Sequence, residues 1–232
     1  MFKPQTMIPS LASNSVSLGI ILAMVGGFLD AYTFISRDGV FANAQTGNIV
    51  LLGVHLALGE WQQMILYIPP IVAFILGIFI SEVSKIFKRK SWITSSRRFV
   101  LLIECIVLVI VGLLPATIHN SVVTILIAFA SSLQIATFNK IDKWNYNSTV
   151  TTGNLRTASK AAYAAWIEHN EEAKKQFKSF AIVIFSFFLG GAIGTYLTVH
   201  IGNPSIWIAV IFLIVALLLY HKDRGYYIKS YR

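Results

Sequence analysis

Long apolar segments are the feature that most constrains how this chain can fold. A bilayer core of roughly 30 Å is crossed by about 20 mostly apolar helical residues. Blocks of about that length recur along the 232 residues, of which only 12% are charged, whereas soluble domains carry about 25%. The pattern therefore predicts an all-α integral membrane protein with a single membrane domain over 1–232. Six transmembrane helices are expected, at 16–35, 65–84, 99–116, 122–138, 180–199 and 204–220.

The remaining composition limits the classes of function. The formal net charge of +9 suits basic loops against anionic lipid, and no nucleic-acid-binding motif accompanies it. A single cysteine, Cys105, excludes a disulfide and a paired redox motif. The sequence has no metalloprotease, nucleophile-elbow or phosphate-loop motif. We expect a non-enzymatic protein without a cofactor, whose main partner is the lipid bilayer. An intramembrane hydrolase that pairs Asp30 with Glu104 is the open alternative.

The two halves of the chain resemble each other. The segment LDAYTF at 29–34 aligns with LQIATF 104 positions later, and a TGN motif recurs with an offset of 106. Each TGN motif is followed by a short helical stretch and then by two long apolar segments. One repeat is therefore expected to contain a span, a polar loop, a short TGN helix and two further spans. The predicted repeats are 16–116 and 122–220, and the predicted TGN helices are 47–59 and 153–167.

The distribution of Lys and Arg predicts the orientation. If the TGN helices do not cross the bilayer, each repeat has three spans. An N-terminus in the cytoplasm then puts every one of the 19 basic residues except Arg37 on the cytoplasmic side. If both TGN helices cross, eight spans result and the basic residues divide almost evenly. Because cytoplasmic loops carry an excess of Lys and Arg, we expect six spans, both termini in the cytoplasm, and a second repeat inverted relative to the first.

The TGN helices are expected to be re-entrant. A helix of about 13 residues reaches roughly 20 Å, so one that enters by a loop places its N-terminus near the bilayer midplane. Secondary transporters point such N-terminal ends at a midplane site. Thr suits a helix cap, Gly permits close approach, and Asn both donates and accepts hydrogen bonds. The expected solute or ion pathway comprises Asp30, Asn43, Gln45, Thr46, Gly47, Asn48, Gln134, Thr152, Gly153, Asn154 and Arg156.

Two alternatives stay open for the TGN helices. Both motifs can be ordinary helix caps with no further role. The second helix can instead lie along the cytoplasmic interface, because Arg156 and Lys160 are costly in hydrocarbon. If it does line a cavity, Arg156 would favour an anion.

Asp30 and Glu104 are candidate coupling groups, because ionisable residues inside a membrane are functional candidates by default. Structural roles are open for both. Asp30 can accept hydrogen bonds from the polar loop 37–45 or pair with Arg37, and Glu104 can pair with a basic loop residue. The counterpart of Asp30 in the second repeat is the neutral Gln134.

The first-half motif also resembles a known family. GGFLDAYTF at 26–34, followed by FANAQTGN at 41–48, resembles the YoaK-type family of bacterial multi-pass membrane proteins. The likeness covers nearly the whole chain, since length, span count and the second TGN motif agree as well. The resemblance implies the plasma membrane of a bacterium. It implies no role for any residue, because the family has no established biochemical function.

These observations predict a transporter or channel whose partner is a small polar or anionic solute. The alternative is a membrane protein without transport, acting as a scaffold or accessory subunit. A homo-oligomer is compatible with either function.

Overall fold

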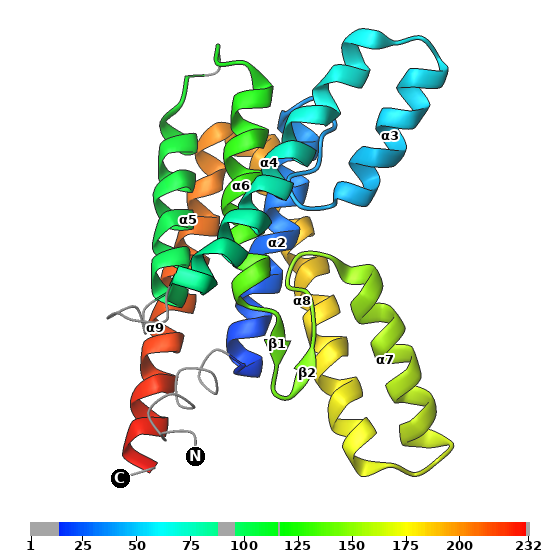
Figure 1. The fold of residues 1–232 in the computed structure, drawn as a ribbon, viewed down its shortest axis with the longest axis vertical. Helices are drawn as coiled ribbons and strands as arrows, with labels where there is room; N and C mark the ends of the chain where they lie inside the picture. Colours follow the sequence, from blue (N-terminus) through cyan, green and yellow to red (C-terminus); the bar gives the residue numbers. More distant parts are fainter. Residues whose placement is uncertain (1–13, 88–95, 116, 231–232) are drawn as a thin grey trace.

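The computed structural model describes residues 14–87, 96–115 and 117–230, and these residues are almost entirely helical (Figure 1). A two-residue antiparallel pair, β1 with β2, interrupts the helices between α6 and α7. The elements are α2 (Val16–Ser36), α3 (Gln45–Ala57), α4 (Trp61–Phe87), α5 (Ser96–Leu113), α6 (Asn120–Thr137), β1 (Lys140–Ile141), β2 (Trp144–Asn145), α7 (Thr151–Trp166), α8 (Glu171–Ile201), the 3-10 turn η2 (Asn203–Ile206) and α9 (Trp207–Ser230).

Five helical segments in the described part of the chain are long and apolar enough to cross a membrane. The predicted sixth span, 99–116, corresponds to α5 up to Leu113, and residue 116 lies outside the described residues. Helix α5 has only 18 residues, and three of them are charged, namely Arg97, Arg98 and Glu104, so it has no uninterrupted apolar stretch of that length. The five segments are Val16–Ser36, Trp61–Val83, Asn120–Thr137, Glu171–Ile201 and Asn203–Lys222. The chain is therefore a multi-pass membrane protein, and the sixth span stays a prediction.

Local signals end the helices where the chain must turn. The Asn170 side chain accepts hydrogen bonds from the N–H groups of Glu172 and Ala173 and so caps α8. Gly202, with φ of 75°, closes the other end of that helix. Pro204 lies in the first turn of the last apolar segment, within η2, which leads directly into α9.

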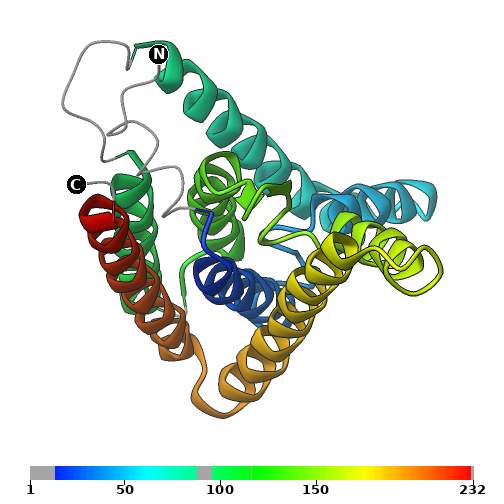
Figure 2. The ribbon, with the colours of Figure 1, turned by 90° about the horizontal axis from the view of Figure 1, so that it is seen from below.

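The helices pack in pairs around α2 and α6, which lie at the centre of the molecule (Figure 2). Helix α2 packs along α8 and α9, and α6 packs along α4 and α5; α3 lies on α4, and α7 lies on α8. The side chains between the central helices are apolar and fully buried, as at Phe28, Leu108 and Ile127. Large apolar side chains such as Phe79, Phe188 and Leu218 are exposed on the outside. This pattern suits a lipid environment, since soluble proteins rarely expose apolar patches of that extent.

Glycines allow α2 and α8 to approach closely. A Cβ on Gly27 would lie 2.0 Å from the Phe187 carbonyl oxygen, and a Cβ on Gly190 would lie 2.0 Å from that of Met24. Neither position leaves room for any side chain, because the obstacle is backbone. Close helix approach through small residues is typical of membrane proteins.

The short helices α3 and α7 occupy one edge of the molecule (Figure 1). Each begins near mid-height and runs toward an opposite end, α3 toward the α3–α4 turn and α7 toward the α7–α8 turn. The α7–α8 turn lies toward the end where α2 starts and α9 finishes. The loop before α3 comprises residues 37–44, here called the first loop, and the loop before α7 comprises 138–150, the second loop.

Candidate functional site: two polar loops on one face of α2

One face of α2 contacts both polar loops. Gly19, Gly26, Asp30 and Thr33 share that face, because residues three, four or seven apart lie above one another on a helix. A Cβ on Gly19 would lie 3.0 Å from the Ile141 side chain in the second loop. The two loops therefore lie end to end along α2 rather than on opposite sides of it.

The loops meet at Gly26. Its carbonyl oxygen accepts a hydrogen bond from the Asn43 side chain of the first loop (3.3 Å). A Cβ on Gly26 would lie 3.0 Å from the Ser148 carbonyl oxygen of the second loop. Even a methyl group here would require the second loop to move by a few tenths of an ångström, so glycine suits this close approach.

Asp30 holds the first loop. Its Oδ1 accepts hydrogen bonds from the N–H groups of Asn43 (2.7 Å) and Ala44 (3.3 Å), which precede the first residue of α3. One turn further on, the Thr33 hydroxyl oxygen accepts the N–H of Ala42 (3.0 Å). The hydrogen bonds match the structural role considered for Asp30, binding to the loop 37–45. They leave its second carboxylate oxygen free.

Arg37 does not pair with Asp30. Its guanidinium donates to the Tyr32 hydroxyl (3.0 Å), to Asn120 at the start of α6 (3.2 Å) and to Asn203 in η2. Arg37 therefore ties the end of α2 to the α5–α6 and α8–α9 connections, and it is buried although it is a cation.

The asparagines of the two TGN motifs make identical contacts. Asn48 Oδ1 accepts the N–H of Phe41 (2.9 Å), and its Nδ2 donates to the carbonyl oxygen of the same residue (2.8 Å). Asn154 makes the same two bonds to Asn147 (3.2 and 2.6 Å). In each case the partner lies seven residues earlier. Both amides thus bind the backbone of their own loop, and both side chains are buried. The expected contact of these amides with a solute stays a prediction.

The pairing of each TGN asparagine with the backbone seven residues earlier is here called the clamp. Nothing in the sequence indicated it directly. The one available hint was the recurrence of Asn after Gly in both repeats, which a solute contact explains equally well. Gln45 joins the first clamp, because its Nε2 donates to the Ala42 carbonyl oxygen (2.8 Å) and its Oε1 accepts from Asn48 (2.9 Å).

The second loop is held by neutral groups. Gln134, at the position of Asp30 in the second half, donates to the Ser148 hydroxyl (3.1 Å). Asn147 Oδ1 accepts the N–H groups of Thr149 (3.0 Å) and Val150 (3.2 Å), which closes the turn into α7.

Three buried acceptor oxygens on these groups have no donor in the described part of the chain: Asp30 Oδ2, Asn43 Oδ1 and Gln134 Oε1. Their side chains are at most 5% exposed. A buried acceptor without a donor is unfavourable. Each of the three oxygens can therefore accept a hydrogen bond from a water or a bound group, and the Asp30 carboxylate can alternatively take up a proton. The described residues hold no group of three His, Cys, Asp or Glu side chains that could bind a metal ion.

The remaining predicted residues point elsewhere. Thr46 and Thr152 are exposed in the first turns of α3 and α7, next to Gly47 and Gly153. Arg156 is exposed as well. At about 100° per residue it lies some 200° around α7 from Asn154, so it faces away from the second loop.

Glu104 is not part of this site. It is fully buried in α5, and its polar neighbour is Ser131 of α6 rather than a residue of either loop. Pairing with a basic residue at the start of α5 was also considered. Arg98 donates instead to His221 (2.6 Å) and lies over the Tyr220 ring.

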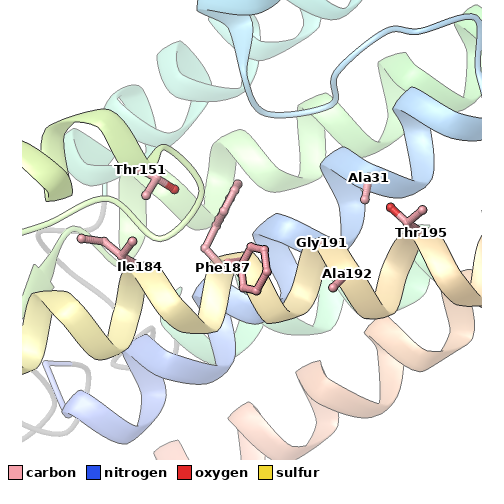
Figure 3. Close-up of a pocket in the computed structure, with 8 residues that line it drawn as sticks. Ala31, Thr151, Ile184, Phe187, Gly191, Ala192 and Thr195 are labelled. Atoms are coloured by element: carbon pink, nitrogen blue, oxygen red, sulfur yellow. The ribbon is translucent and has the colours of Figure 1, made fainter.

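A groove of about 480 Å³ opens beside the site, between α2, α8 and the start of α7 (Figure 3). Ala31, Phe187 and Thr195 line it, and Thr151 supplies a hydroxyl group from the first residue of α7. The groove is mainly apolar.

The sequence comparisons agree with this architecture. A family model described as "Protein of unknown function (DUF1275)" matches residues 18–219. The chain belongs to this family. A relative in Bacillus subtilis (strain 168), "UPF0700 transmembrane protein YoaK", is 25% identical over 205 residues, which cover 83% of this chain and 88% of that protein. These matches confirm the expected YoaK-type family, and they confirm the prediction that the chain is a membrane protein. No solved structure matches the chain.

Proposed function

We propose that this member of the family is a transporter or channel for a small polar or anionic solute. The observation that carries the proposal is the pair of half-length helices, α3 with 13 residues and α7 with 16, which begin near mid-height beside two polar loops. Non-helical backbone at membrane depth is tolerated only where it is buried in protein or lines a wet cavity. Transporters place such helix ends at a midplane site.

We infer further that the membrane domain has six spans arranged as two inverted repeats, with α3 and α7 re-entrant. The packing supports this, because exchanging the halves turns each of the main contacts between α-helices into another that exists: α2–α8 becomes α6–α4, and α3–α4 becomes α7–α8. The glycine contacts follow the same exchange. A Cβ on Gly190 would meet the Met24 carbonyl oxygen, and one on Gly77 would meet that of Phe129.

The direction of the helices supports the inversion. Helices α2 and α6 run in opposite directions in Figure 1, and the α3–α4 and α7–α8 turns lie at opposite ends. Together with the distribution of Lys and Arg, this favours both termini in the cytoplasm. The similarity to the Bacillus subtilis transmembrane protein supports the plasma membrane of a bacterium as the location.

Within the proposed pathway, Asp30 has the role of the coupling group. Its free Oδ2 gives it the capacity to take up a proton or contact a solute while Oδ1 keeps the first loop in place. Gln134 cannot titrate, so the two half-sites would differ in charge although they are built alike.

Swelling of proteoliposomes in stopped-flow light scattering tests the proposal. The probes are formate, nitrate and chloride as anions, and glycerol and urea as neutral solutes. Wild-type protein should accelerate swelling with at least one probe. Thr46→Ala and Thr152→Ala should slow it, because both threonines are exposed in the first turns of α3 and α7, where the two half-length helices begin. Ser159→Ala is the matched control, because Ser159 is exposed on the same side of α7 as Thr152 but about two turns further from the start of the helix.

Asp30→Asn keeps the size of the side chain and removes its titration. We expect it to abolish the pH dependence of swelling while the protein stays folded. Equal rates and equal pH dependence in wild type and Asp30→Asn would return Asp30 to a purely structural role.

A membrane accessory protein without transport is the second candidate. The groove favours an accessory protein, because its lining is mainly apolar. Of the two polar loops and the first turns of α3 and α7, only Thr151 contributes to that lining. An accessory protein would show no swelling above empty liposomes with any of the five probes, and it would tolerate both threonine substitutions.

A further inference from the structure

The outer face of α7 is polar and basic. Thr152, Arg156, Ser159, Lys160 and Tyr163 are all exposed on one side of the helix, while Asn154, Ala158 and Ala161 are buried on the other. Neither Arg156 nor Lys160 forms an ion pair with a described residue, and α7 contains no acidic residue. Two uncompensated cations therefore face outward from this helix.

The first half of the chain shows that the fold does not require these cations. With the offset of 106 that aligns the TGN motifs, Arg156 corresponds to Val50 and Lys160 to Val54. Both valines are exposed on the outer face of α3. An apolar face is what acyl chains accept, so the basic face of α7 serves something other than folding.

The depth of the two cations follows from the helix geometry. Helix α7 begins near mid-height, and at 1.5 Å per residue Arg156 lies about 8 Å and Lys160 about 14 Å along the axis from Thr151. Half of the hydrocarbon core is about 15 Å. Long basic side chains extend toward the headgroups from such depths. Both charges can therefore reach the headgroup level.

The end of α7 lies at the same level as the charged start of α8. The rings of Trp166 and Phe177 are 4.8 Å apart in an edge contact, which aligns the two helix ends. Lys174, Lys175 and Lys178 are exposed on that part of α8. Glu168, Glu171 and Glu172 are exposed there as well, and Glu171 pairs with Lys174 (3.4 Å). The end of the hairpin is therefore close to neutral, so the uncompensated positive charge of this region is that of Arg156 and Lys160.

We propose that Arg156 and Lys160 bind the phosphate of an anionic phospholipid on the outer face of α7. The proposal rests on the re-entrant placement of α7 proposed above, but not on transport. Two cations one helical turn apart can share one phosphate, with the acyl chains along the apolar surface of α8. A soluble anion would use the same chemistry but would not contact that surface.

Binding of short-chain phosphatidylglycerol to the detergent-solubilised full chain, measured by native mass spectrometry, tests the proposal. Phosphatidylcholine of equal chain length is the reference lipid. The variant R156V/K160V copies the first half of the chain and should bind phosphatidylglycerol about 30-fold more weakly, because each basic residue at an anionic surface contributes roughly fivefold. The control K174Q/K175Q removes the same charge from the same hairpin and should keep the wild-type affinity.

Single variants keep the test decisive if the double variant does not fold. R156K retains the charge and should bind as wild type does, whereas R156Q should lose about fivefold. Equal affinity of wild type and R156V/K160V for phosphatidylglycerol would overturn the proposal. So would an equal loss in K174Q/K175Q, which would indicate a diffuse charge effect.

Two further outcomes would replace the lipid with another ligand. If inorganic phosphate displaced phosphatidylglycerol at equal concentration, the ligand would be a soluble anion. If R156V/K160V changed the mass of the purified protein from one oligomer to another, the face would be an interface between copies. Neither measurement uses a solute gradient, so both can be interpreted whether or not the swelling assay detects transport.

Discussion

Asn48 and Asn154 show how one motif can serve two kinds of chemistry. An amide side chain is the residue type that a polar solute needs, and it is also the side chain that best mimics a peptide group. In this chain the second property is used, because each amide pairs with the N–H and carbonyl of the residue seven positions earlier. The TGN asparagines therefore hold the two loops in place, and their contact with a solute stays a prediction.

We predict that Asn48→Ala and Asn154→Ala each lower the free energy of unfolding by about 2 kcal/mol or more. Each change removes two hydrogen bonds and leaves a peptide N–H and carbonyl unpaired in a poorly hydrated loop. The measurement is thermal unfolding of the purified chain in detergent. Asn145→Ala in β2 is the control, because Asn145 is exposed. Unfolding temperatures equal to wild type would show that the clamp adds nothing to stability.

At the scale of elements, the crossing of α2 and α8 depends on the absence of side chains. A Cβ on Gly27 or on Gly190 would lie 2.0 Å from a carbonyl oxygen of the opposite helix. Backbone cannot yield as the end of a side chain can, so the two helices would have to separate. Separation would also displace the second loop, which lies on the next face of α2.

We predict that Gly27→Ala and Gly190→Ala each destabilise the protein by about 3 kcal/mol, the upper end of the usual cost of overpacking. Gly53→Ala is the matched control in α3, because a Cβ there meets nothing within 4 Å. That change should raise stability slightly, since Ala is favoured over Gly in a helix by about 1 kcal/mol. A lower unfolding temperature for Gly53→Ala than for Gly27→Ala would contradict this packing of α2 against α8.

At the scale of the whole molecule, the number of spans decides the relation between the halves. Three spans per half invert the second repeat, whereas four would leave the halves parallel. The six-span arrangement predicts that the α5–α6 connection and the start of α8 lie on opposite sides of the membrane.

Cysteine labelling in intact cells measures this directly, after Cys105→Ala has removed the native thiol. Thr117→Cys in the α5–α6 connection should react with a membrane-impermeant maleimide from outside. Lys175→Cys should react only after the membrane is permeabilised. Both native side chains are exposed, so access depends on the side of the membrane and not on burial. Labelling of Lys175→Cys from outside would favour eight spans.

A helical membrane protein could be predicted from the sequence alone, and the short TGN helices were located within about two residues. Both properties follow from the length of the apolar segments and from the recurrence of a motif, which are local features of the sequence. The YoaK-type family was predicted from the resemblance of the first-half motif. The sequence also identified Asp30 and Asn43 as residues worth attention, because polar groups beside a span are costly unless they are used.

Which groups those residues contact became known from the packing of the helices. The choice of Asn120 and Asn203 as partners of Arg37, and of Ser131 as the neighbour of Glu104, depends on helices far apart in the chain. So does the meeting of both loops at Gly26. A hydrogen bond depends on distances of a few tenths of an ångström, and these are fixed by how helices cross, which no periodicity in the sequence encodes.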